Sequence, residues 1–293
     1  MKKPTLSYLF GILCLLLPIV SLSAESTTSA NVENVADTPT NVAHLESLFS
    51  RMEESTSGEY RKFLSDSIKV VLYDELIKEG SFDTEFPNMP ILRCVTASDD
   101  KIRLFTWNVE MENGTNGYVC FMQTSDGYLK YFDKVDRPSK PRPQDRIRNR
   151  WYGCVYTGII PQEVKEKTGK RTVYLLFGWA CNSVETRYNI VDVIGIDERN
   201  RIEFGYDLFK VKNEKKLLRL IFTHDRDSRM VMEYQPQKKR IVMDHLVPID
   251  KKYRNKKKQA MGPDHQTYDA LKRSGNKWKL VEDVRVKRLE TSE

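Results

Sequence analysis

The amino-acid sequence predicts a mainly antiparallel β protein that begins with a helical pair, and is therefore α+β overall. Two observations carry this prediction. Apolar residues recur at helical spacing only between positions 45 and 76. After Pro90, almost every apolar run is short, rich in Val, Ile, Tyr and Phe, and bounded by turn residues, which is typical of strands.

The first 24 residues have the layout of a secretory signal peptide. Lys2 and Lys3 precede an apolar run at positions 9–20, and a short polar end leads to Ala24. The run is too short for a spanning helix, which needs about 20 apolar residues, although a retained anchor is the alternative. The sequence therefore predicts a Sec-type signal cleaved after Ala24, a periplasmic or secreted protein, and no later transmembrane segment.

Residues 25–42 are rich in Ser, Thr, Asn and Ala, and this composition predicts a flexible tether. The helical pair is expected within 43–86. Its first apolar stripe runs from Leu45 to Met52, and its second runs from Tyr60 to Leu76, before Gly80 as a C-cap. The break between the stripes predicts a tight turn and two antiparallel helices.

The β region divides into a first unit at 87–136, a basic Pro-rich linker at 137–150 and a main domain at 151–288. Its turns are short and rich in Asp, Asn, Gly and Ser, so adjacent strands are expected to pair antiparallel. Strands are expected near 91–97, 101–109, 117–124, 127–134, 152–160, 171–180, 187–197, 201–205, 216–224, 228–235, 239–246, 266–273 and 277–287.

A weak internal repeat suggests how the strands are grouped. Similar segments around Phe105, Phe177 and Phe222 each open a strand, and each is followed by a turn, a strand, a turn and a strand. Three-stranded meanders that recur in this way are typical of propeller-like blades or of the halves of a sandwich. The repeat does not distinguish the two architectures.

The formal net charge of +7 is concentrated in two runs. Residues 137–150 hold six basic residues and one acidic residue, and residues 251–258 hold six basic residues and none acidic. An exported protein rarely meets nucleic acid, so the expected partner is an anionic envelope component or another envelope protein. Solvated loops are the alternative. The candidate binding residues are Arg146, Arg148, Arg150, Lys256, Lys257 and Lys258.

Four cysteines follow the signal peptide: Cys94, Cys120, Cys154 and Cys181. An even number in an exported chain favours disulfides, whereas buried free thiols are the alternative. Cys94 and Cys120 are expected on strands that flank a third strand, a separation of about 10 Å, which exceeds the Cα limit of about 7 Å for a disulfide. No Cys-x-x-Cys is present.

Three histidines stand beside an aspartate, a combination used in metal sites and by general bases. The pairs are His224–Asp225, Asp244–His245 and Asp264–His265. We take His224, Asp225 and His245 as candidate metal ligands, and Asp264 and His265 as candidate binding residues. Strand parity places His224 and His245 on opposite faces unless a bulge intervenes. Strand-end residues that bond the local backbone are the alternative.

The sequence predicts no catalytic residue and no cofactor. It contains no Gly-x-Ser-x-Gly, no P-loop and no Gly-x-Gly-x-x-Gly. Aromatic residues in the β units offer a binding surface for sugars or peptides, with core packing as the alternative. They are Trp107, Trp151, Tyr152, Tyr156, Trp179, Tyr188, Tyr206 and Trp278.

A set of short segments spread over 150–288 resembles an uncharacterised family of secreted, β-rich proteins from Bacteroidetes bacteria. The segments are Trp151-Tyr-Gly with Ile159-Ile-Pro, Leu175-Leu-Phe-Gly-Trp, Phe204-Gly-Tyr-Asp-Leu-Phe, Met261-Gly-Pro-Asp with Tyr268-Asp, and Trp278-Lys-Leu-Val-Glu-Asp-Val. The resemblance implies export and a β-rich body. It implies no reaction, cofactor or catalytic residue.

Together these observations favour an exported, non-catalytic binding or interaction protein of the periplasm or cell envelope. The alternative is a hydrolase of an envelope polymer or glycan that uses Asp and His residues within 224–265 as acid and base.

Overall fold

A computed structural model describes residues 40–135, 147–148, 151–166, 169–181, 183–197, 199, 201–249 and 260–286. All of the described residues belong to one compact unit, Pro39–Glu293. The predicted signal peptide, the tether up to residue 39, most of the linker at 137–150 and the run at 251–258 lie outside the described residues.

Two helices open the described chain, as the apolar spacing predicts. Helix α1 spans Asn41–Glu54 and helix α2 spans Gly58–Leu76. The side chains of Thr40 and Ser57 accept hydrogen bonds from the backbone N–H groups of residues 43 and 60, which satisfies donors that a helix start leaves unpaired. In the described residues, no helix has the length and apolar character needed to cross a membrane.

The first sheet, sheet A, has four antiparallel strands in the order β1-β2-β3-β4. A 3-10 turn, η1 at Ser81–Asp83, joins α2 to this sheet. The strands are β1 Arg93–Thr96, β2 Ile102–Glu110, β3 Asn116–Thr124 and β4 Leu129–Asp133.

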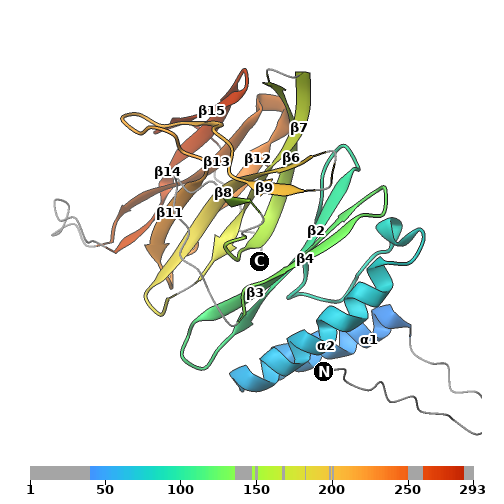
Figure 1. The fold of residues 1–293 in the computed structure, drawn as a ribbon. Helices are drawn as coiled ribbons and strands as arrows, with labels where there is room; N and C mark the ends of the chain where they lie inside the picture. The colour runs from blue at the N-terminus through green and yellow to red at the C-terminus, as the bar shows by residue number, and fades with distance from the viewer. Residues whose placement is uncertain are drawn as a thin grey trace, which may run out of the picture. The chain divides into compact units, whose positions relative to one another are not determined.

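Both helices cover one face of sheet A (Figure 1). Phe105, Trp107 and Phe121 project from the sheet into the core between the two layers. The first apolar stripe of the helices is buried there, whereas the second stripe is buried only in part, because Tyr60 and Phe63 are exposed. The helix side chains buried in this core include Leu45, Phe49, Leu64, Ile68 and Leu72.

The second sheet, sheet B, has the strand order β5-β9-β8-β7-β6, and β11 also pairs with β8. All of its described pairs are antiparallel. The strands are β5 Ile147–Arg148, β6 Val155–Glu166, β7 Gly169–Ala180, β8 Thr186–Ile196, β9 Ile202–Phe204 and β11 Leu220–Asp225.

The third sheet, sheet C, has the order β10-β15-β14-β13-β12. Only the short β10–β15 pair is parallel among its described pairs. The strands are β10 Phe209–Lys210, β12 Met232–Gln235, β13 Arg240–Pro248, β14 Met261–Ser274 and β15 Lys277–Val281, and a 3-10 turn, η2 at Pro236–Lys238, joins β12 to β13.

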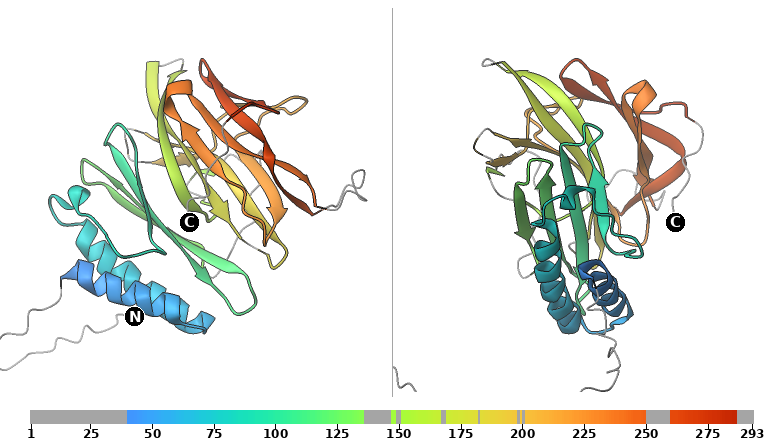
Figure 2. Two further views of the ribbon diagram at one scale, coloured as in Figure 1. Left: turned by 180° about the vertical axis from the view of Figure 1, so that it is seen from behind. Right: turned by 90° about the vertical axis from the view of Figure 1, so that its right-hand side faces the viewer.

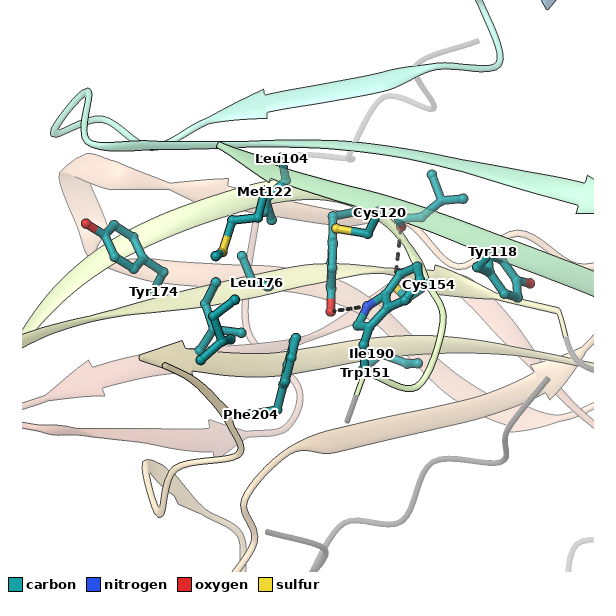
Figure 3. Packing of buried hydrophobic residues seen from close by; sticks show 14 of the residues in the cluster. Leu104, Tyr118, Cys120, Met122, Trp151, Cys154, Tyr174, Leu176, Ile190 and Phe204 are labelled. Atoms are coloured by element: carbon teal, nitrogen blue, oxygen red, sulfur yellow. Dashed lines mark hydrogen bonds between the residues drawn. The ribbon is translucent and has the colours of Figure 1, made fainter. Parts of the chain in front are cut away.

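The three sheets stack as layers, with sheet B in the middle (Figure 2). Figure 3 shows Leu104 and Met122 of sheet A facing Leu176 of sheet B. A second core joins the other face of sheet B to sheet C through residues such as Val191 and Trp278. The stacked sheets agree with the sandwich alternative and not with radial blades.

The predicted third meander is split between two sheets. Strand β11, which carries Phe222, pairs with β8 of sheet B, whereas β12 and β13 belong to sheet C. The internal repeat therefore does not describe the fold at 216–246. Local periodicity identifies these strands correctly, but it carries no information on which distant strand each one joins.

Candidate functional site

The first of the predicted metal ligands, His224, is buried in sheet B. Its Nε2 lies 2.8 Å from Oδ1 of Asn189, and its Nδ1 lies 2.9 Å from the carbonyl oxygen of Asp225 and 3.1 Å from the Ser228 hydroxyl. Burial lowers the pKa of His224 below its ordinary value, and the charge of Arg187 acts in the same direction. Local groups thus occupy both ring nitrogens, and the ring favours its neutral form.

His245 lies instead in sheet C, at a register shift of β13 between Asp244 and Leu246. Its Nδ1 is 2.9 Å from a carboxylate oxygen of Asp269. In a second pair, Nδ1 of His265 is 3.4 Å from Oδ1 of Asp244. Because residue 244 is paired with residue 268 and residue 269 with residue 243, strand alternation places the two carboxylates on opposite faces of sheet C.

The predicted metal ligands therefore do not form one site. Among the described residues, no group of three or more His, Cys, Asp or Glu side chains is arranged to hold a metal ion. The carboxylates also have local roles: Asp244 accepts a hydrogen bond from the N–H of Val231 at 2.7 Å, and Asp264 accepts one from the Thr267 hydroxyl at 2.7 Å.

The candidate aromatic surface is mostly core. Of the eight aromatic residues singled out in the sequence, six are buried, and Trp179 and Tyr206 are partly buried. Trp151, for example, donates its indole N–H to the Tyr156 hydroxyl at 3.1 Å inside the core between sheets A and B. Core packing, the alternative stated for these residues, is therefore the better description.

The sequence reasoning did not find a basic pocket of about 590 Å³ at one end of sheet B. The β6–β7 hairpin and the turn from β8 to β9 form it, and we call it the Arg171 pocket. Its volume lies within the usual range for ligand pockets, about 300–1,000 Å³. Among the described residues, four cations and two carboxylates line it: Lys170, Arg171, Arg199, Arg201, Glu166 and Asp197, together with Gly169 and Ile196.

Arg171 is the most informative residue of this pocket. Its Nε and Nη2 are buried and have no hydrogen-bond partner among the described residues, and its Nη1 is 4.0 Å from the Glu166 carboxylate. The guanidinium carbon lies 5.5 Å from the centre of the Tyr206 ring. An aromatic face therefore supports the guanidinium, while its Nε–Nη2 edge has no acceptor in the described part of the chain.

A glycine makes this arrangement possible. A Cβ atom at Gly195 would lie 2.3 Å from the Tyr206 hydroxyl and 3.0 Å from Nη2 of Arg171. Burial raises the pKa of Tyr206 to about 12, so the phenol is neutral at physiological pH. Gly195 thus leaves the space in which Tyr206 and Arg171 pack together.

The other charges of the pocket are partly neutralised. Asp197 accepts hydrogen bonds from Nε of Arg201 at 2.7 Å and from the N–H of Arg199 at 2.9 Å. The bond from Arg201 is the main reason why the pKa of Asp197 falls to about 2. Lys170 pairs with Glu163 at 2.8 Å. Within the described part of the chain, Arg171 and Arg199 are thus the cations of this pocket that make no ion pair shorter than 4.0 Å.

The predicted basic residues are mostly beyond the described chain. Arg146, Arg150 and Lys256–Lys258 lie outside the described residues, and only the backbone of Arg148 is described. Strand pairing places Arg148 opposite Glu203, which is in turn opposite Gly195. The described part of the predicted linker, at 147–148, therefore lies two strands from Gly195, beside which Arg171 and Tyr206 pack.

The cysteines are free thiols in the structure. As expected, Cys94 and Cys120 lie on strands that flank β2. Burial raises the pKa values of Cys120 and Cys154, so these thiols stay protonated. Both pack as small apolar residues in the core between sheets A and B.

Comparison with known proteins found no match: no family model, no curated protein and no solved structure is similar to this chain.

Proposed function

We propose that this chain is an exported, non-catalytic binding protein that holds an anionic component of the cell envelope in the Arg171 pocket. The observation that supports the proposal is that Nε and Nη2 of Arg171 are buried without an acceptor among the described residues, on a side chain that lines a pocket whose described lining holds four cations and two carboxylates. Export rests on the signal-peptide layout of residues 1–24.

The chemistry of the unpaired edge favours an oxyanion. Nε and Nη2 of an arginine lie side by side and match a carboxylate or phosphate in two parallel hydrogen bonds. The same edge of Arg201 holds Asp197, and that of Arg219 holds Asp192. Because a buried donor without an acceptor is unfavourable, a bound oxyanion would remove a cost that the free protein carries.

The binding test uses inorganic phosphate as the probe, with isothermal titration calorimetry at low salt. We expect Arg171→Met to weaken phosphate binding about tenfold or more, because charge-assisted hydrogen bonds are lost. The matched control is Arg93→Met, because Arg93 is an exposed arginine on β1 in sheet A. Equal affinity of the wild type and Arg171→Met would reject this site.

A second arm identifies the source of the anion. Vesicles with and without phosphatidylglycerol are compared with soluble phosphate in a co-sedimentation assay. Binding to the anionic vesicles that depends on Arg171 indicates a lipid headgroup, whereas binding to phosphate alone indicates a soluble ligand. If the protein binds neither the anionic vesicles nor phosphate, the proposal is overturned.

The hydrolase alternative has less support from the described residues. His224 is buried, and strand alternation separates the carboxylates of the two His–Asp pairs. We therefore assign no acid or base.

A further inference from the structure

We propose that the edge of sheet A at β4, which no further described strand covers, together with α2 beside it, binds an extended peptide segment of a partner protein as an added strand. This site is distinct from the Arg171 pocket and does not depend on it. Strand addition to a sheet edge beside a pocket is an established mode of peptide recognition, in which backbone hydrogen bonds give affinity and side-chain pockets give specificity.

The first argument is the hydrogen-bonding edge of β4. This strand ends the order of sheet A, and within the described residues it pairs only with β3. The N–H of Lys134 bonds the carbonyl of Tyr118 at 2.8 Å, and the N–H of Thr124 bonds that of Tyr128 at 2.9 Å. Because bonding alternates along an antiparallel pair, the backbone groups of Tyr131 and its neighbours at 129 and 133 point away from β3.

The second argument is a pocket of about 470 Å³ beside this edge. Val70 and Tyr73 of α2 line one side and Tyr131 of β4 lines the other, with Phe121 of β3 also in the lining. The rings of Phe121 and Tyr131 stack with centroids 5.6 Å apart. The pocket has the size and apolar lining to receive a large side chain.

The third argument is an apolar row along α2 and its C-cap that the described residues leave exposed. Phe63, Val70 and Ile77 recur every seven residues and are exposed, whereas Leu64 and Leu72 are buried against the fold. A concentrated exposed apolar surface marks an interaction site. Most exposed large apolar side chains of the described chain lie on α2, at its C-cap or on β4: Tyr60, Phe63, Val70, Tyr73, Ile77 and Tyr131.

The polar rim favours a peptide over a flat apolar partner or a second copy of α2. Asp66 would interrupt a helix–helix seam built on the row at 63, 70 and 77. Lys69 bonds Asp66 and Asp133, and Asp74 also lines the pocket. An extended peptide can fill the pocket with one apolar side chain and place a basic residue near Asp74. The charged side chains around the pocket then remain in ion pairs or in contact with solvent, which avoids the cost of burying an unpaired charge.

The experiment selects ligands from a phage library of random linear 12-residue peptides and measures the synthetic peptides by fluorescence anisotropy. We expect Val70→Glu to weaken binding at least tenfold. The matched control is Val184→Glu, because Val184 is 59% exposed and Val70 is 61% exposed. Circular dichroism confirms that both variants fold.

A second pair of variants tests the added strand itself. Tyr131→Ala removes the side chain, and Tyr131→Pro also removes the outward N–H, which an edge strand tolerates. We expect Tyr131→Pro to bind more weakly than Tyr131→Ala. The proposal would be overturned if no peptide is selected, or if the selected peptides bind Val70→Glu and Tyr131→Pro with the same affinity as the wild type. A dimer in sedimentation that Val70→Glu dissociates would assign the surface to a second copy instead.

Discussion

At the scale of single residues, the polar side chains of the strands mostly complete local hydrogen bonding. His224 illustrates this, because its ring lies between Asn189 and the turn that contains Ser228. The sequence identified the His–Asp neighbours but not their partners, which come from other strands. The bulge of β13 shows the same limit, since parity reasoning allowed for a bulge without locating it.

The lowered pKa of His224 predicts a pH dependence of stability. The unfolded chain has the ordinary histidine pKa of about 6.5 and takes up a proton before the folded protein does. The free energy of unfolding should therefore be highest above pH 6.5 and fall as the pH decreases below it. Urea unfolding at about pH 7.5 and about pH 5, on either side of this pKa, measures the fall. In His224→Gln the fall should be smaller, and an identical fall would contradict the assignment.

At the scale of elements, the helical pair and the strands follow from periodicity. Strands β2 and β3 match the expected segments closely, because both are long apolar runs between good turns. Strand β14 begins at Met261, earlier than the strand expected near 266–273, and includes the polar residues Asp264 and His265. Its pairing with β13 on both sides of the bulge supports a strand that its own residues do not favour.

Strand β6 has a register shift, where it pairs with β7, between Tyr156 and Gly158. A Cβ atom at Gly158 would lie 2.0 Å from the ring of Phe177 on β7. We expect Gly158→Ala to lower the free energy of unfolding by about 1–3 kcal/mol, the usual cost of overpacking. Urea unfolding of Thr157→Ala, at the exposed neighbouring position, is the control. An unchanged free energy for Gly158→Ala would show that the ring moves without cost.

At the scale of the whole molecule, pairing between strands that are distant in the sequence decides what the sequence could not. The basic runs that were visible in the sequence are contiguous, whereas the Arg171 pocket combines two turns that β7–β8 pairing brings together. A buried ion pair also depends on such pairing, because Arg219 directly precedes β11, which pairs with β8, the strand that carries Asp192. Arg219 is fully buried, lies 3.2 Å from Asp192 and stands 4.2 Å from the centre of the Tyr152 ring.

Breaking this ion pair from one side should be strongly destabilising. Burial raises the pKa of Asp192, although Arg219 opposes this shift, so the carboxylate depends on its partner. We expect Arg219→Met to cost about 3–5 kcal/mol of unfolding free energy. The double variant with Asp192→Asn should cost less than the sum of the single variants, because no unpaired charge remains. Additive costs in a double-mutant cycle would contradict coupling between the two residues.

The position of sheet B between two cores has a consequence for the order of synthesis. Strands β6 to β9 are made before sheet C, which begins at Phe209. Until the later strands follow, the face of sheet B that carries Val173, Leu175 and Val193 has no cover. A nascent chain halted between β9 and β10 would therefore expose an aggregation-prone apolar surface and would need a chaperone to stay in solution.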